Sequence, residues 1–247
     1  MVARFPLLLA TVLLFAATRA HGDEPGGPSL PLDEIVRLDT SRAADDRRGL
    51  GVAFFVSPRR IATNWHVLSP WDDVQATLRK GEKMTIRGVA AASAELDLAI
   101  LDLTEPVKGV RGLELAVDPL AGKQQAWAVG HPQGDAFVLR SGVVGREIRT
   151  SQLAARPQAF VRRAIGGDKD LRWLQHSVPL TDGDSGGPLF DARGRVLGVN
   201  TWVDDTTHAA YALHAAQLAE FLEQPTGEPR SLAEVRAALA EKSEAKK

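Results

Sequence analysis

Short apolar and alternating apolar–polar segments, separated by turn residues, recur through most of the chain. In the first half they cover residues 35–38, 51–56, 61–63, 74–78, 84–89 and 98–103. In the second half they cover residues 125–129, 137–139, 142–148, 171–177, 188–190, 196–202 and 209–213. Many short strands at regular spacing are typical of a barrel or sandwich, so we predict an all-β fold.

Two stretches interrupt this pattern. Residues 104–123 are rich in glycine and proline, and we predict that they connect a first barrel, about residues 34–104, with a second, about residues 124–213. Residues 150–170 are polar and basic without a clear period, which indicates a loop.

Near the C-terminus the apolar residues change from strand-like to helical spacing, and two short helices are expected there. Ser231 and Glu234 form a capping-box pattern at the start of the second helix, in a tail over residues 224–247. Apolar stripes at helical spacing comprise Leu218, Phe221 and Leu222 in the first helix and Leu232, Val235 and Leu239 in the second. We expect both stripes to pack onto the barrels, with contact between copies of the chain as the alternative.

The N-terminal 22 residues have the pattern of a secretory signal peptide. Arg4 is followed by an apolar run from Phe5 to Ala17, and Thr18-Arg19-Ala20 offers small residues for cleavage. A membrane anchor is the alternative, but the run is shorter than the roughly twenty residues of a span. Residues 23–33 read as a flexible leader, and no later segment is long and apolar enough to cross a membrane.

Composition narrows the class of protein. Of the 247 residues, 44% are hydrophobic and 25% are charged, as in ordinary globular domains. The formal net charge of -1 gives no reason to expect a nucleic-acid partner. The chain has no cysteine and therefore no disulfide, which favours a bacterial periplasmic or secreted protein among exported ones.

The segment Gly183-Asp184-Ser185-Gly186-Gly187-Pro188-Leu189 places a serine in a glycine-rich turn. A serine hydroxyl is a weak nucleophile until a base takes its proton and donors stabilise the oxyanion. Two upstream segments supply a base and its partner: Ile61–Leu68 contains His66, and Leu96–Leu101 contains Asp97. The order His, Asp, Ser is one of several convergent orders of the same triad.

With these segments the sequence resembles the chymotrypsin-like serine proteases, most closely their bacterial HtrA-type (Deg-type) branch, over roughly residues 35–223. The segments Ala128–Gly134 and Gly194–Thr201 also resemble that branch. The resemblance implies two six-stranded antiparallel β-barrels within residues 34–223 and short C-terminal helices. It implies an exported serine endopeptidase that cuts unfolded or exposed polypeptide segments through an acyl-enzyme intermediate, without a cofactor. Assembly into a homo-oligomer stays open.

The resemblance also assigns roles to residues. Ser185 is the nucleophile, His66 the general base and Asp97 the acid that orients His66, while the backbone N–H groups of Gly183 and Ser185 form the oxyanion hole. Glu95 and Asp102 are rivals of Asp97 that do not occupy the motif position. Four further histidines, His131, His176, His208 and His214, match no metal-site spacing, so we expect no metal; His176 is expected beside the substrate cleft.

One wall of the substrate pocket is expected from Pro179 and Leu180, and the other from Val199, Asn200 and Thr201. Pro179 stands where trypsin-like enzymes place an acid. We therefore expect a small or medium apolar residue, rather than lysine or arginine, before the scissile bond.

Asp184 stands where trypsin-like enzymes have an aspartate that pairs with a newly released N-terminus, whereas the HtrA-type branch usually has asparagine. The first fifty residues contain no Ile-Val-Gly-Gly type of start. We expect no activation by propeptide cleavage, and an Asp184 that pairs with an internal arginine or faces water. HtrA-type proteases also usually carry peptide-binding PDZ domains after the protease domain, and we expect none in the short tail.

Two other functions are alternatives to the endopeptidase. A protease-fold protein without activity would act as a peptide-binding or chaperone-like module, which the complete triad argues against. An esterase of the α/β-hydrolase type needs Gly-x-Ser-x-Gly, which Gly183–Gly187 fits, but also a histidine after the serine. The histidine that stands in a matching motif, His66, precedes Ser185, which argues against this esterase class.

Overall fold

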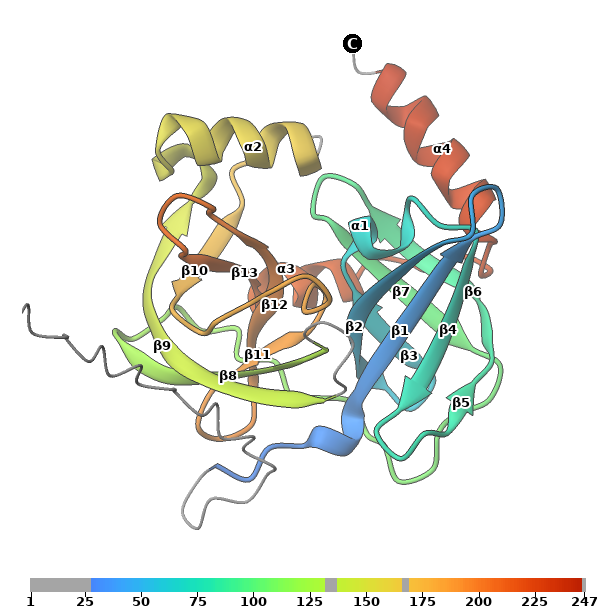
Figure 1. Ribbon diagram of the computed structural model, residues 1–247, viewed down its shortest axis with the longest axis horizontal. Helices are drawn as coiled ribbons and strands as arrows, with labels where there is room; N and C mark the ends of the chain where they lie inside the picture. Colours follow the sequence, from blue (N-terminus) through green and yellow to red (C-terminus); the bar gives the residue numbers. More distant parts are fainter. Residues whose placement is uncertain (1–27, 132–136, 166–168, 246–247) are drawn as a thin grey trace, which may run out of the picture.

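A computed structural model describes residues 28–131, 137–165 and 169–245, and shows two β units packed side by side (Figure 1). The first unit is a sheet of strand order β5-β4-β1-β2-β3-β7-β6. The second is a closed barrel of order β10-β13-β12-β11-β8-β9. All pairings between these strands are antiparallel, which confirms the predicted all-β, chymotrypsin-like class.

The strands fall close to the apolar segments of the sequence. Those of the first unit are β1 (Ile35–Arg42), β2 (Arg47–Ser57), β3 (Arg60–Thr63), β4 (Asp73–Leu78), β5 (Lys83–Met84), β6 (Ile86–Ser93) and β7 (Leu98–Leu103). Those of the second are β8 (Gln124–Gly130), β9 (Val138–Arg149), β10 (Arg172–His176), β11 (Pro188–Phe190), β12 (Val196–Val203) and β13 (Ala210–His214).

The first unit corrects the prediction of a six-stranded barrel. The segment expected as one strand over residues 84–89 is divided at Thr85 into β5 and β6, which pair with β4 and β7 respectively. Because β5 and β6 are the two outermost strands of the sheet and consecutive in the chain, the curled sheet closes through the covalent chain at Thr85. Two register shifts in β6, typical of bulges, accompany this curvature.

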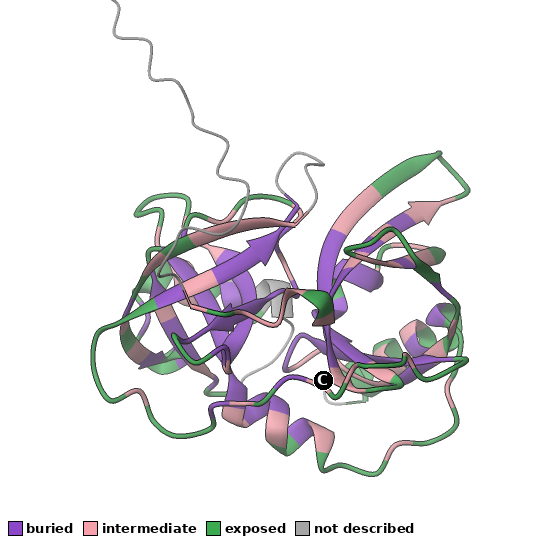
Figure 2. Ribbon diagram, turned by 90° about the horizontal axis from the view of Figure 1, so that it is seen from below, coloured by how far each residue is buried: buried purple, intermediate pink, exposed green. Residues whose placement is uncertain are grey.

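Alternation along β2 builds two cores at once, because successive side chains of a strand point to opposite faces. Ala53 and Phe55 belong to the core of the first unit. Val52 and Phe54 instead join a cluster that includes Trp173 and Phe190 of the second unit. Figure 2 shows the resulting buried interior in both units, with exposed residues concentrated in the outer loops. The apolar core is therefore continuous across the seam between the units.

Residues 150–170 are not the loop that the sequence predicted. They contain a short 3-10 helix, η3 (Thr150–Gln152), and an α-helix, α2 (Ala155–Ile165). Val161 of α2 is buried in the core cluster that spans the seam. Apolar residues do recur here at helical spacing, at Phe160, Val161, Ala164 and Ile165, and the prediction of a loop overlooked this period.

The two C-terminal helices are confirmed as α3 (Ala215–Leu222) and α4 (Leu232–Glu244). His214 caps α3 by accepting a hydrogen bond from the Ala216 N–H, and Ser231 and Glu234 form the expected capping box of α4. Leu218 and Phe221 are buried in the core that crosses the seam, whereas Leu232 and Val235 are buried in the first unit's core. The stripes thus pack within the chain, and the tail returns from the second unit to the first.

A short antiparallel bridge between Val89 and Arg230 supports this return. Within the described ranges, none of the helices has both the length and the apolar character needed to cross a membrane. The proposed signal peptide lies outside the described residues.

We predict that Leu218→Ala lowers the free energy of unfolding by about 2–5 kcal/mol, because it removes a fully buried side chain at the junction of α3 and the barrel. Urea unfolding followed by circular dichroism measures the change. Glu220→Ala, at an exposed position of the same helix, is the matched control. Equal stability of both variants would contradict the packing described for α3.

Candidate active site

A buried carboxylate holds the imidazole of His66. His66 belongs to α1 (Trp65–Leu68), which follows β3, and Asp97 directly precedes β7. Asp97 Oδ1 accepts a hydrogen bond from the His66 backbone N–H at 2.8 Å, and Asp97 Oδ2 lies 2.6 Å from His66 Nδ1. The Asp97 carbonyl accepts hydrogen bonds from Trp65 N–H and Asn64 Nδ2. One residue therefore fixes both the backbone and the ring of the histidine.

Asp97 achieves these contacts in an uncommon backbone conformation. Its φ of 52° lies in the left-handed region, which aspartate enters more readily than most residues. The two rival acids are placed elsewhere: Asp102 lies 3.5–3.6 Å from Arg59, Arg60 and Arg87, and Glu95 pairs with Lys169. Asp97 is thus the acid that contacts His66.

The pKa of His66 is set by opposing effects. Burial of the ring lowers the pKa, but the charge of Asp97 and its hydrogen bond favour the imidazolium, and the net pKa is raised above the ordinary 6.5. The side chain nevertheless remains 44% exposed, so its outer edge can meet a ligand.

Ser185 stands in a turn that belongs to the second unit but is bonded to the first. Its carbonyl accepts a hydrogen bond from the Val52 N–H of β2 at 2.9 Å. At Gly186, φ is 86°, and a Cβ would lie 2.2 Å from Thr63 Oγ1 and 2.3 Å from the Val52 carbonyl oxygen. Only glycine permits this close approach, which places Ser185 against the strands that carry His66.

Ser185 and His66 line the same cavity of about 490 Å³, between the two units. Within the part of the chain that the structure describes, Ser185 Oγ makes no hydrogen bond, either to His66 or to any other group. The Asp97–His66 pair and Ser185 thus face one cavity at the seam, without a direct bond between the hydroxyl and the imidazole.

Two N–H groups in the serine turn are left for a ligand. Within the turn, Asp184, Gly186 and Gly187 donate their N–H groups to backbone carbonyls. Among the described residues, no acceptor is found for the N–H groups of Gly183 and Ser185. These are the two donors that the sequence predicted for an oxyanion hole, and developing negative charge is what such donors stabilise.

An internal ion pair supports the same turn. Asp184 is almost fully buried, and its Oδ1 lies 2.5 Å from Nη2 of Arg140 in β9. Its Oδ2 accepts a hydrogen bond from the Thr181 N–H at 2.6 Å. Of the two alternatives for Asp184, pairing with an internal arginine is therefore confirmed.

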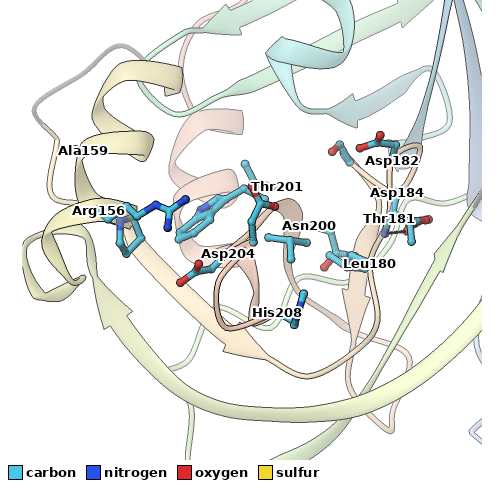
Figure 3. A pocket seen from close by; sticks show the side chains of 15 residues that line it. Arg156, Ala159, Leu180, Thr181, Asp182, Asp184, Asn200, Thr201, Asp204 and His208 are labelled. Atoms are coloured by element: carbon cyan, nitrogen blue, oxygen red, sulfur yellow. Dashed lines mark hydrogen bonds between the residues drawn. The ribbon is translucent and has the colours of Figure 1, made fainter.

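Ser185 also lines a second cavity, of about 890 Å³, most of whose other lining residues differ from those of the first (Figure 3). Figure 3 shows Arg156 and Asp204 at one side of it and Leu180, Thr181 and Asp182 at the other. Of the residues predicted for the substrate pocket, three line it: Leu180, Asn200 and Thr201.

Pro179 and Val199 are corrections to that prediction, because neither lines the cavity. Pro179 is exposed to solvent. Val199 is fully buried in the core that crosses the seam.

The residues at the far end of this cavity were not predicted from the sequence. They include Arg156, Trp202, Asp204, Asp205 and His208. Asp204 accepts a hydrogen bond from the Thr206 N–H, which lowers its pKa and keeps it ionised. Asp204 and Asp205 directly follow β12, so an extension of the predicted strand by two residues would have identified them. Arg156 lies in α2, a helix that was not predicted. The cavity therefore carries negative charge that the argument from Pro179 overlooked.

Two of the other histidines, His131 and His176, are buried and line neither cavity. The Nδ1 of His131 accepts the Phe137 N–H, and burial lowers the pKa of this ring to about 4. Burial lowers the pKa of His176 to about 3, and this ring does not line the cleft as expected. Among the described residues, no group of three or more potential ligands is arranged to hold a metal ion.

Comparison with known proteins gives consistent results. A family model described as a trypsin-like peptidase domain matches residues 51–199. The chain is 32% identical to the putative serine protease HhoA of Synechocystis, over 81% of this chain and 53% of that protein. It is 27% identical to a probable periplasmic serine endoprotease DegP-like of Halomonas elongata, over 65% of this chain and 31% of that protein. The chain thus spans about half or less of the length of these relatives.

Solved structures show the same fold. The active form of the Rv3671c protease of Mycobacterium tuberculosis superposes with a TM-score of 0.69 at 21% identity, covering 88% of this chain and 98% of that one. The HtrA-type protease AlgW with a tripeptide superposes with a TM-score of 0.62 at 22% identity, covering 78% of this chain and 60% of that one.

We predict that Asp97→Asn lowers the pKa of His66, because it removes the charge that outweighs burial of the ring. NMR titration of the histidine ring signals measures both values, with the wild-type pKa expected above 6.5. Asp45→Asn, which removes an exposed carboxylate paired with Arg42, is the control and should leave the pKa of His66 unchanged. A wild-type pKa below that of the variant would contradict the geometry.

Proposed function

The chain belongs to the trypsin-like peptidase family, and we propose from this premise that it is a serine endopeptidase that uses Ser185, His66 and Asp97 as its triad. The observation that carries the proposal is the Asp97–His66 pair, which opens into a cavity that Ser185 also lines. The names of its relatives as serine proteases support the same reaction class.

The geometry suits nucleophilic catalysis in two stages. His66 Nε2 takes the proton of Ser185 Oγ as that oxygen attacks the peptide carbonyl, while Asp97 holds Nδ1–H and stabilises the imidazolium. The N–H groups of Gly183 and Ser185 stabilise the oxyanion of the tetrahedral intermediate. His66 then gives the proton to the departing amine, and an ester joins the acyl half of the substrate to Ser185. Water, activated by His66, hydrolyses that ester.

The serine turn requires support to keep its donors aimed at one point, and we assign that task to the Arg140–Asp184 ion pair. Both partners belong to the mature fold, so the turn can form without the release of a new N-terminus. Cleavage of a propeptide is therefore not part of the proposed activation.

The substrate is an extended, unfolded or exposed polypeptide segment. The pairing of β12 with β11 ends at the pair formed by Val199 and Pro188. Residues 201–203 of β12 lie beyond this pair, and they offer a strand edge next to Ser185. An extended chain can pair there through main-chain hydrogen bonds. A small or medium apolar side chain before the scissile bond would contact Leu180, while Asp204 and Asp205 favour basic residues farther along the cavity.

We further propose that the protein is exported to the periplasm or secreted. The signal-like pattern of residues 1–22 supports export, and so does the periplasmic name of the Halomonas elongata relative. In this proposal residues 34–223 form the protease domain, to which the tail over residues 224–247 is attached.

A fluorophosphonate probe, which labels only an activated serine, tests the activity directly. Wild-type protein should be labelled and should cleave a denatured protein mixture, whereas Ser185→Ala should lose labelling and about a million-fold in kcat. Ser177→Ala, at an exposed serine outside the cavity, is the control. Absence of labelling in well-folded wild-type protein would favour the peptide-binding module instead.

Removal of Arg140 tests the support of the oxyanion turn. Arg140→Met leaves the Asp184 carboxylate buried without its partner, so we expect a loss of about 3–5 kcal/mol of stability and slower fluorophosphonate labelling. The double variant Arg140→Met with Asp184→Asn removes the stranded charge and should recover most of that stability. Additive effects of the two substitutions in a double-mutant cycle would argue against the pair.

A further inference from the structure

The cavity of about 490 Å³ on the His66 side of Ser185 has a distinct chemical character. Half of the side chains that line it are apolar, those of Leu50, Val67, Pro70 and Trp71. The others are those of His66, Ser185 and the oppositely charged Arg48 and Asp182. The larger cavity shares only Asp182 and Ser185 with it. A peptide bond at Ser185 thus has one cavity on each side.

The reaction itself assigns the smaller cavity to one half of the substrate. His66 must deliver its proton to the departing amine, so the residues after the scissile bond lie on the side of His66. The cavity that His66 lines is therefore the place of the leaving-group half, and the β12 edge holds the acyl half.

Trp71 is the largest side chain of this cavity and is half-buried. Its ring rests directly on the backbone of β2: a Cβ at Gly49 would lie 2.4 Å from Trp71 Cζ2 and 2.6 Å from Cε2. The guanidinium of Arg42 lies 6.0 Å from the ring centroid on the same hairpin, within the range of a cation–π contact. The ring therefore offers a pre-positioned aromatic surface beside the reacting serine.

The backbone of Trp71 is held from outside the protease core by α4. Arg236 Nη2 donates a hydrogen bond to the Trp71 carbonyl at 2.6 Å, and Arg236 Nη1 lies 3.8 Å from Asp72 Oδ1. The start of α4 is anchored by Leu232 and Val235 in the first unit's core. Figure 1 shows α4 beginning beside the hairpin that joins β1 and β2.

We propose that Trp71 is a specificity-determining residue for the leaving-group half of the substrate, and that Arg236 of α4 is its positioning residue. The subsite takes a large apolar or aromatic side chain in the first or second residue after the scissile bond. Contact between two aromatic rings adds to the burial of apolar surface, so discrimination of about tenfold is expected. The proposal rests on the proposed endopeptidase function.

The test uses quenched fluorescent peptides with one acyl half, which differ only in carrying phenylalanine or glycine in the two positions after the scissile bond. Wild-type protein should show a kcat/KM about tenfold higher for the phenylalanine peptide. Trp71→Ala should bring that ratio close to one, and Trp71→Phe should keep part of it.

Arg236→Gln should lower the same ratio, chiefly through a higher KM for the phenylalanine peptide, and Arg236→Lys should rescue it in part. Lys242→Gln, at an exposed position of α4 that makes no contact with Trp71, should behave as wild type. Thermal unfolding of each variant separates loss of selectivity from loss of fold; if Arg236→Gln does not fold, the Arg236→Lys ratio decides the role of α4.

The outcomes separate the two proposals. Wild-type protein that fails to react with a fluorophosphonate would overturn the endopeptidase function itself. Protein that reacts and cleaves both peptides equally, or keeps its preference in Trp71→Ala, would overturn the leaving-group subsite alone. An unchanged ratio in folded Arg236 variants would overturn the positioning role of α4.

Discussion

The buried carboxylate of Asp97 is the constraint on which the site depends. A charge inside the protein is tolerated only when its oxygens are bonded, and Asp97 meets this need through the backbone and ring of His66. The arrangement demands a left-handed backbone at residue 97 and a helix that begins at Trp65. The same contacts that satisfy the buried acid raise the pKa of the imidazole and aim its free edge at the seam.

The seam turns two β units into one reactive centre. Val52 N–H binds the Ser185 carbonyl, Gly186 packs against Thr63 and Val52, and the apolar core continues from Phe54 to Phe190. Neither unit contains all three residues of the proposed triad, because Ser185 comes from the second and His66 and Asp97 from the first. In the proposed mechanism, packing across this boundary therefore sets the distance over which the proton is transferred.

The C-terminal tail links the proposed leaving-group subsite to the two β units. α3 packs on the second unit and α4 on the first, so the chain after the barrels contacts both. Through Arg236, α4 reaches the turn that carries Trp71, on the far side of Ser185 from Asp204 and Asp205. The cavity that contains Trp71 and the cavity that contains Asp204 and Asp205 thus share Ser185 but differ in chemical character. Under the proposed function, this difference would orient an extended substrate.

The sequence by itself determined most of the strands and the capping box at Ser231, and it predicted the three residues of the proposed triad, because each depends on a local period or a short motif. Only the tertiary structure decided the division at Thr85, the pairing of Asp184 with Arg140 and the lining of both cavities. Each of these depends on contacts between residues far apart in the chain, and a local pattern does not record which distant partner a side chain meets. Val199 illustrates the difference: its place in a strand was predictable, but which face of that strand meets the core was settled by the barrel.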